Sequence, residues 1–580
     1  MRMHMSLSAV IAATSLAIAQ TPRPPIEAFG SGCGGQGQPA SIESTSLWPG
    51  QLATLHFHDL PANRAASLLL GGSNTQWGGL SLPVPLAGIG MPGCQLLVAV
   101  DNFLVFATGN GSPTFTFPVP LDPGLAAQDI YMQVLHEQPG LNAMGLATSI
   151  GLRARVSPLP TPTQAVTSIT QFGITFQFAQ PVQAGQFVNG DWFVIGPVTV
   201  VDMLPQSIDY SGRVINGAMV NPDPSTREQG YDGNMYLPGN EYLYIPAKNV
   251  AWGLDAAHPL VLHPNDSLVK TISNLNPNVI PDLETCSVLT CLAAPPPFGS
   301  FRPPYAGTDH QVRFDVQMLD YSALASLVPA PGMPNVAAQT AKFERPWLDH
   351  CPGWPSRYMH PALNMPDYGR DFTSLYNEAA LLCNVTITPQ ERQLLVMRLV
   401  QIGIDFWGNV KNGCYWEGVG GQNSGRKLPI LFAGALLRDA EMLGVGSLVS
   451  QRFLNGTYTI HFGEDGQTFY VQQTAPGVLN WGYGNYTQAD VGVPEFGFSH
   501  VHWPASDHQG WFDDSYRRCC TANAWIGGVL CARIMGLVDE WNHPPLFDYM
   551  DRYVTVETTG WTKAWSTWCG SMWDQYRQFY

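Results

Sequence analysis

The chain has 580 residues, of which 45% are hydrophobic and 12% are charged. At roughly 100–200 residues per domain, this length predicts about three or four domains, and the hydrophobic share excludes a disordered chain. The 28 basic and 44 acidic residues give a formal net charge of −16. This charge argues against a nucleic-acid-binding protein, because such proteins carry a basic surface. An acidic polymer would have to bind in a local basic pocket.

The first 19 residues have the pattern of a secretory signal peptide. Arg2 and His4 precede a short apolar stretch, and Ala17-Ile18-Ala19 supplies a small-x-small cleavage site. The apolar stretch is too short to span a bilayer. We therefore expect a secreted, periplasmic or cell-surface protein without a membrane span.

All 11 cysteines follow this segment, so disulfides are expected in an oxidising compartment. Cys33 and Cys94 are the only two before residue 286, which predicts that they pair. Cys286 and Cys291 are close enough in sequence to close a loop, and at least one of the other cysteines must stay free. Zinc is the alternative use of cysteine, but no Cys-x-x-Cys pair occurs, so no metal or other cofactor is predicted.

The N-terminal half has the pattern of two β-domains. Residues 28–156 alternate short apolar runs with Gly, Pro and Asn turns, and residues 157–163 form a Pro-rich linker. Residues 164–320 hold further strand-like runs, with Asn189-Gly190-Asp191 as a hairpin turn between two of them. We expect two antiparallel β-sandwich-like domains here.

Residues 321–580 have helical periodicity. Thr388-Pro389-Gln390-Glu391 is a capping box with Pro at the first helical position. Further helices are predicted from Pro429 to Leu443, from Ala522 to Met535, from Pro544, and from Trp561 to Phe579. Helix following helix favours an all-α domain built as an (α/α) toroid, complete or incomplete, and a plain bundle is the alternative.

No serine elbow, P-loop, HExxH or dinucleotide-binding glycine pattern stands in a suitable context. Polar residues gather instead in loops of the helical domain. The first loop places Tyr368 and Arg370 in a Pro/Gly turn before a helix, where they either rim a substrate site or cap the helix.

A second loop, residues 415–427, runs into a helix start and holds Trp416, Asn423, Arg426 and Lys427. A helix N-terminus favours anions, so cations placed there are locally unfavourable. A carboxylate ligand would explain them, and packing of the loop against the helix is the alternative.

The third loop, residues 490–520, is the richest, because it places three of the 14 histidines within nine positions. Its reactive and aromatic side chains include His500, His502, His508, Tyr516, Arg517, Trp503 and Trp511. Clustering of this kind on a helical scaffold indicates a functional site. Structural histidines, or a metal pair formed by His500 and His502, are the alternatives. The indoles suit a sugar ligand, because the C–H faces of sugars stack on aromatic rings, although core filling is the alternative for each of them.

These residue types fit β-elimination of a uronic-acid polysaccharide. Removal of the C5 proton requires the adjacent carboxylate to be neutralised, which Asn, a protonated His or Arg can do. A base such as Tyr or His takes the proton, and an acid, often the same Tyr, returns one to the departing O4. Because Tyr normally titrates at about 10, cations must tune it, and Arg426, Arg517 or Arg518 could act on Tyr516.

With these roles, residues 340–580 resemble the polysaccharide lyases built on (α/α) toroids, which use an Asn/His/Tyr/Arg set. Those lyases commonly place β-domains after the toroid, whereas here the β-domains precede it. The resemblance implies a secreted lyase for an acidic polysaccharide, with either His500 or His508 supplying the histidine. The expected catalytic residues are Asn423, His500, His508, Tyr516 and Arg517, and the expected substrate-binding residues are Tyr368, Arg370, Trp416, Arg426, Lys427, Trp503 and Trp511.

Two other functions stay open. A glycoside hydrolase on the same kind of toroid needs two carboxylates, and the candidates are Glu417, Asp490, Glu495, Asp513 and Asp514. A non-catalytic glycan-binding surface protein would use its β-modules. Residues 28–156 resemble a small β-module of large secreted bacterial proteins, which implies attachment to a cell surface or spacing. The resemblance is carried by Gly30-Ser31-Gly32-Cys33, by Gly72-Ser73-Asn74-Thr75-Gln76-Trp77-Gly78-Gly79 and by Pro92-Gly93-Cys94.

Overall fold

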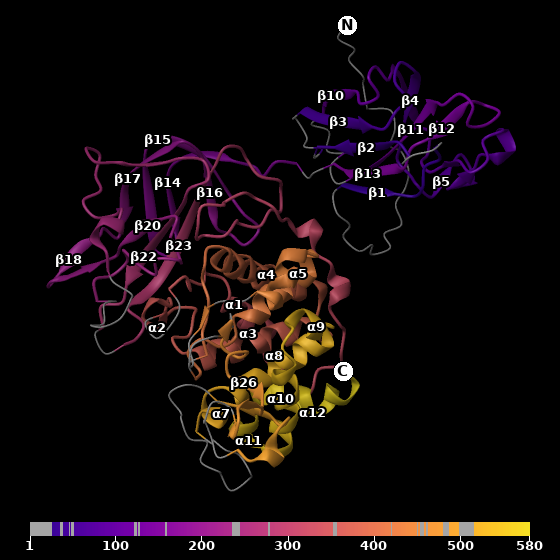
Figure 1. Ribbon diagram of the computed structural model, residues 1–580. Coiled ribbons are helices and arrows are strands. Elements are labelled where there is room, and N and C mark those ends of the chain that lie inside the picture. The colour runs from indigo at the N-terminus through magenta and orange to yellow at the C-terminus, as the bar shows by residue number, and fades with distance from the viewer. Residues whose placement is uncertain are drawn as a thin grey trace. The chain divides into compact units, whose positions relative to one another are not determined.

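The structure is a computed structural model of the chain. It describes residues 26–34, 39–45, 47, 52–120, 125, 128–156, 159–234, 244–276, 279–351, 356–418, 420–448, 451–452, 458–459, 462–479, 486–497 and 515–580. The predicted signal peptide lies outside the described residues. The chain forms two compact units, Met1–Thr161 with Pro297–Gly299, and Pro162–Pro296 with Ser300–Tyr580. As predicted, the chain is multidomain, with β-sheets in its N-terminal half and helices in its C-terminal region (Figure 1).

The first unit contains two main antiparallel sheets, besides the two-stranded pairs at residues 76–81 and 84–96. The larger has the order β1 (Ile26–Phe29), β13 (Gly151–Arg155), β11 (Asp129–Glu137), β4 (Ala65–Gly71) and β9 (Asn102–Ala107), with β12 (Leu146–Thr148) beside β11. The smaller has the order β10 (Thr114–Pro118), β3 (Leu52–His58) and β2 (Ser41–Ser44). Alternate residues Ala53, Leu55 and Phe57 of β3 are buried in a core shared with Leu68 and Val134 of the larger sheet. The predicted disulfide between Cys33 and Cys94 is confirmed.

The second unit begins with an eight-stranded sheet. Its order is β20 (Ala218–Val220), β22 (Ser267–Ser273), β23 (Leu283–Leu292), β16 (Trp192–Ile195), β15 (Ile174–Gln186), β17 (Val198–Leu204) and β21 (Leu260–Leu262), with β14 (Gln164–Gln171) beside β15. The predicted hairpin at Asn189-Gly190-Asp191 joins β15 to β16, and Gly190 has the positive φ of 91° that this turn requires. β16 and β23 pair in parallel, so the expectation of a purely antiparallel domain is corrected.

The proposed link between Cys286 and Cys291 is wrong, because both thiols are free and buried. The two residues lie five positions apart on strand β23, and side chains at odd spacings point to opposite faces of a sheet. Cys286 packs with Tyr305 and Leu348 on one face, and Cys291 packs with Leu262 on the other. The sheet is covered on both faces, which explains why every residue of β23 except Glu284 is buried.

The C-terminal region is mainly helical, but the prediction of an all-α domain is corrected, because short strands such as β26 (Thr468–Tyr470) and β29 (Pro494–Phe496) pair within it. Its longer helices are α3 (Gly369–Cys383), α4 (Pro389–Lys411), α5 (Lys427–Leu437), α8 (Ala522–Ile534), α10 (Pro544–Val556) and α12 (Thr567–Tyr576). The short helices are α1 (Val336–Ala341), α2 (Ser356–Met359), α6 (Ala440–Leu443), α7 (Ser515–Cys519), α9 (Val538–Trp541) and α11 (Gly560–Lys563). The predicted capping box between Thr388 and Glu391 starts α4, and the Pro544 start of α10 is also observed.

Two predicted helices are broken. α5 starts at Lys427 rather than Pro429 and ends at Leu437, because Arg438 adopts a left-handed conformation with φ 54°. α6 then begins separately at Ala440. The predicted helix from Trp561 to Phe579 is likewise divided, because Ala564 is extended between α11 and α12.

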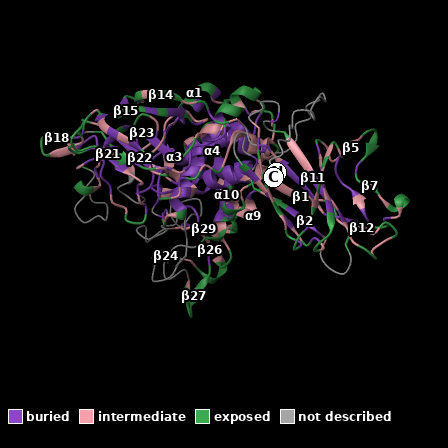
Figure 2. Cartoon of the chain, turned by 90° about the horizontal axis from the view of Figure 1, so that it is seen from above, coloured by how far each residue is buried: buried purple, intermediate pink, exposed green. Residues whose placement is uncertain are grey.

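The long helices pack in pairs, α3 against α8 and α4 against α5. Glycines allow the close approach: a Cβ at Gly528 would lie 2.8 Å from Asn377 Cγ, and one at Gly403 would overlap the carbonyl of Pro429. Figure 2 shows the resulting buried core across α3, α4 and α10. Among the described residues, no helix has the length and hydropathy needed to cross a membrane.

Candidate functional site

The first and second polar loops meet in space with the segment that joins α7 to α8. Gly369, at the start of α3, lies so close to the loop of residues 420–426 that a Cβ there would overlap the carbonyls of Gly421 and Gln422. A Cβ at Gly421 would in turn lie 2.7 Å from Tyr368 Oη and would overlap the carbonyl of Cys520. Glycine is therefore required where these segments touch. Segments from residues 368–370, 421–422 and 516–520 thus converge, although they are far apart in sequence.

Tyr368 and Tyr516 belong to segments that converge at this junction, since Gly421 lies against both Tyr368 and the carbonyl of Cys520, whose N–H donates to the carbonyl of Tyr516. Both side chains are partly buried, and Tyr516 packs against the helical core. The pKa of Tyr368 is raised, first by burial and then by the neighbouring Tyr516, while Arg370 and a hydrogen bond with the backbone of Gly421 act in the opposite direction. Tyr368 is therefore a protonated phenol at neutral pH, able to donate a proton or a hydrogen bond.

Arg370 is the cation beside these phenols. Its Nε donates to Asp371 Oδ1 at 2.9 Å, and its Nη1 donates to the carbonyl of Cys519 at 2.9 Å. Its guanidinium lies 3.7 Å from the ring centre of Trp565 and 5.4 Å from that of Tyr368. These contacts hold the guanidinium between the rings of Trp565 and Tyr368, with its side chain 20% exposed.

Two exposed indoles that the sequence did not single out adjoin Arg370. Trp565 is 40% exposed and Trp561 is 54% exposed, and their rings lie edge to face with centres 6.5 Å apart. Asn523 fixes the local backbone, since it accepts from Trp565 N–H and donates to Trp561 C=O. The sequence predicts one helix from Trp561 to Phe579, but Ala564 is extended between the two tryptophans. Exposed aromatic faces of this kind suit sugar rings.

A vicinal disulfide joins Cys519 to Cys520 between α7 and α8. The sequence left the pairing of these two cysteines open. Their carbonyls make the contacts just described, with Arg370 and Gly421 respectively. The disulfide therefore lies in the backbone segment that links Tyr516 to the other two stretches.

The remaining predicted residues of the second loop are buried rather than exposed. Asn423 donates to the carbonyl of Glu417 at 3.0 Å. Arg426 Nε donates to Asp349 Oδ2 at 2.7 Å, and Lys427 Nζ to Asp465 Oδ2 at 2.5 Å. The carboxylate partners that these cations required are therefore supplied by the chain itself.

Trp416 and Arg517 are also part of the interior. Trp416 stacks between Phe406 and Phe462, with ring centres 5.5 and 5.9 Å away. Arg517 is fully buried and pairs with Glu495 at 3.2 Å. Both side chains are therefore buried and do not form an exposed substrate-binding surface.

The other predicted residues, His500, His508, Trp503 and Trp511, lie outside the described residues, as do His502, Asp513 and Asp514. Within the described part of the chain, no three His, Cys, Asp or Glu side chains gather as metal ligands would. The junction thus offers two phenols, one guanidinium and two indoles, a set suited to acid–base chemistry beside a sugar carboxylate.

No protein-family model matches the sequence, and no curated protein matches it either. Among solved structures, the crystal structure of Salmonella alpha-2-macroglobulin reacted with methylamine has a TM-score of 0.15 and 9% identity to this chain. That match covers 92% of this chain and 36% of the Salmonella chain, so this chain spans about a third of its length. So low a TM-score carries no argument about fold or function.

Proposed function

We propose that the protein is a secreted polysaccharide lyase that cleaves a uronic-acid-containing polysaccharide by β-elimination, on a helical region of the (α/α) toroid kind. The observation that carries the proposal is the convergence of the segments that hold Tyr368, Arg370 and Tyr516. Elimination needs a base, an acid and a cation for the carboxylate, and this junction supplies all three residue types.

Tyr516 is the base that removes the C5 proton. Tyr368, which burial keeps protonated, is the acid that donates a proton to the departing O4 as the C4–O4 bond breaks. The electron pair from the C5–H bond forms the new C4=C5 double bond, so no water enters the product. Two phenols with separate roles avoid the need for one tyrosine to take and return the same proton.

Arg370 is the group that binds the uronate carboxylate. Charge on that carboxylate opposes loss of the neighbouring proton, and a cation offsets it. Nε and Nη2 of Arg370 already pair with Asp371, and Nη1 donates to the carbonyl of Cys519, so the uronate would bind the remaining N–H groups of Nη1 and Nη2. The edge-to-face indoles Trp565 and Trp561 hold flanking sugar rings. Asn423, Arg426, Lys427 and Arg517 act here as positioning residues, because their ion pairs and hydrogen bonds fix the segments that carry the phenols.

Two of the carboxylates that a hydrolase could use, Glu495 and Asp490, are engaged within the chain. A glycoside hydrolase needs two carboxyl groups facing the substrate. Glu495 is fully buried between Arg517 and Arg552, and Asp490 caps a short helix through Thr487. Both therefore already have structural partners.

The class of reaction is tested by its products. The protein is incubated with alginate, glucuronan and glycosaminoglycans in ¹⁸O-labelled water, and ultraviolet absorbance, reducing ends and product mass are followed together. We expect new ultraviolet absorbance from an unsaturated sugar without ¹⁸O in the product. Reducing ends that carry ¹⁸O and lack the chromophore would show a hydrolase, and no product from any polymer would favour a glycan-binding protein.

A further inference from the structure

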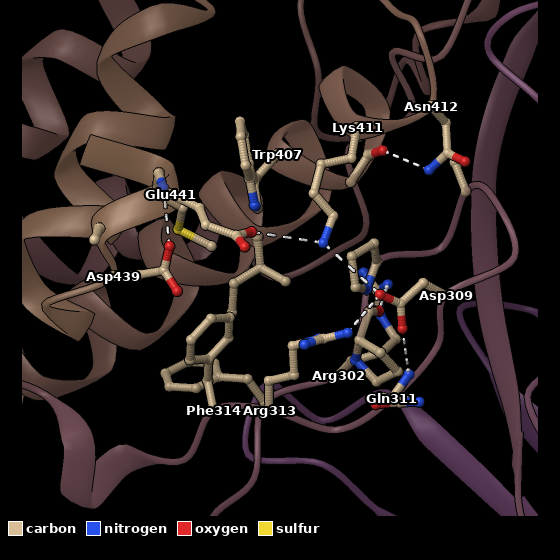
Figure 3. A pocket seen from close by; sticks show the side chains of 18 residues that line it. Arg302, Asp309, Gln311, Arg313, Phe314, Trp407, Lys411, Asn412, Asp439 and Glu441 are labelled. Carbon is tan, nitrogen blue, oxygen red and sulfur yellow. Dashed lines mark hydrogen bonds and ion pairs between the residues drawn. The ribbon is translucent and has the colours of Figure 1, made fainter. Parts of the chain in front are cut away.

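A second site lies in a cavity of about 270 Å³ between the C-terminal half of α4, the start of α6 and the segment of residues 301–314. Figure 3 shows side chains entering it from both walls: Trp407, Lys411 and Glu441 from the helices, and Asp309 and Arg313 from the facing segment. None of the residues that line it belongs to the Tyr368 and Tyr516 junction. The volume is slightly below the roughly 300 Å³ at which pockets for drug-sized ligands begin, so it suits a ligand of about one sugar ring.

The walls of the cavity are fixed before any ligand binds. Gly408 of α4 packs on Pro304, where a Cβ at Gly408 would lie 2.7 Å from Pro304 Cγ. Arg302, just before this proline, is buried and makes two hydrogen bonds to Asp405 of the same helix. The cavity is therefore not a gap that rearrangement of the segment would close, and binding there costs little ordering entropy.

The charges of the cavity alternate in sign and compensate one another. Lys411 Nζ lies 3.7 Å from Asp309 Oδ2 and 3.9 Å from Glu441 Oε2, and Arg313 Nη2 lies 2.6 Å from Asp309 Oδ2. Both lysine distances are longer than a hydrogen bond. Within the described residues, the Lys411 ammonium therefore has donors free for a ligand while its charge is already balanced.

We propose that this cavity binds one neutral sugar ring. An anionic ligand would meet Asp309 and Glu441, and a cationic one would meet Lys411 and Arg313, so each would have to disrupt the alternating pairs. A neutral ring instead donates hydroxyl hydrogens to the carboxylates and accepts from Lys411. Its apolar C–H face stacks on Trp407, which is partly exposed in the cavity. This site is independent of the proposed lyase chemistry.

The test measures binding of methyl glycosides to the full chain by saturation-transfer NMR. The neutral ligands are the methyl glycosides of glucose, galactose and mannose, and methyl glucuronide is the charged comparison. We expect saturable binding of at least one neutral glycoside, at least tenfold weaker in Trp407→Ala and at least threefold weaker in Glu441→Gln. Glu441 is 70% exposed at its side chain, so its substitution leaves the fold intact. Trp252→Ala is the control, because Trp252 is 51% exposed and lies outside the cavity, and its binding should match the wild type.

Binding of none of the neutral glycosides would overturn the proposal. So would tighter binding of methyl glucuronide than of every neutral glycoside, or unchanged affinity in both Trp407→Ala and Glu441→Gln. Loss of lyase activity plays no part in this experiment, so its failure is distinct from failure of the proposed function.

Discussion

The guanidinium of Arg302 makes two parallel hydrogen bonds to the carboxylate of Asp405, Nη1 to Oδ1 at 2.9 Å and Nη2 to Oδ2 at 2.6 Å. Its Nε donates to Asp191 at 2.5 Å, beside the turn between β15 and β16. All three side chains are almost completely buried. One arginine therefore ties the eight-stranded sheet to helix α4.

Arg302→Met is expected to destabilise the protein by ~3–5 kcal/mol, because it leaves two carboxylates buried without their cation. Equilibrium unfolding in urea, followed by circular dichroism, measures this loss. Lys248→Met is the matched control, since its ion pair with Glu228 is part-exposed and worth at most about 1 kcal/mol. Equal losses in the two variants would contradict a special role for Arg302.

The buried carboxylate of Asp349 makes the stability of the folded protein depend on pH. Burial alone would raise its pKa, but Arg426 at 2.7 Å and His360 at 3.3 Å hold the pKa below its ordinary value. A lowered folded-state pKa contributes stability above the unfolded-state pKa, and that stability is lost as pH falls through the folded-state value. Asp349→Asn should therefore be less stable at neutral pH and should lose less stability than the wild type below about pH 4.

Thermal unfolding from pH 3 to pH 7 measures this difference. Asp367→Asn is the control, because Asp367 pairs with Arg357 at a part-exposed position. An Asp349→Asn variant whose stability fell with acid as steeply as that of the wild type would contradict the assignment.

The structure predicts how many cysteine thiols an alkylating reagent can label. The structure has seven free cysteines, all buried, and burial raises their thiol pKa values, that of Cys291 to about 12. Iodoacetamide at pH 8 should label none of them in the native protein and should label seven after unfolding without reductant. Mass spectrometry of the intact chain measures the number of labels per chain.

Cys286→Ser sharpens this test. If Cys286 is free, the variant loses one label after unfolding, leaving six of the seven. If it were bonded to Cys291, the substitution would instead release a partner thiol and raise the count.

The exposed indole of Trp565 should act in substrate binding rather than in chemistry. Trp565→Ala removes a stacking surface that also lies against Arg370, and we expect the KM for the polysaccharide to rise about tenfold, ~1.4 kcal/mol, with little change in kcat. Steady-state kinetics separate the two constants. Trp252→Ala, at a similarly exposed indole in the sheet region, should leave both unchanged, and a fall in kcat alone for Trp565→Ala would contradict the assignment.

Local signals in the sequence predicted local structure well. The capping box at Thr388, the turn at Gly190 and the disulfide from Cys33 depend on neighbouring residues or on the absence of other partners, and all three are confirmed. The buried ion pairs were not predictable in this way. Arg426 is 77 residues from Asp349 along the chain, so its charge resembled a ligand site until the fold brought the carboxylate to it.

The candidate site likewise contains residues that the sequence predicts and residues that it does not. The residue types of Tyr368, Arg370 and Tyr516 predict a site, and in the structure the segments that carry them converge. The exposure of Trp561 and Trp565 depends on a break between α11 and α12, which helical periodicity alone does not predict.

The central claim is that Tyr368 and Tyr516 act as acid and base in one elimination. It is tested most directly by the initial rate of ultraviolet absorbance increase of Tyr516→Phe on the polysaccharide that the wild type degrades, with Tyr210→Phe, at a 48% exposed tyrosine, as control. We expect a loss of about 10³-fold for Tyr516→Phe, and about 10²-fold for Tyr368→Phe, with the control at the wild-type rate. A Tyr516→Phe enzyme that is folded and retains the wild-type rate would contradict the account.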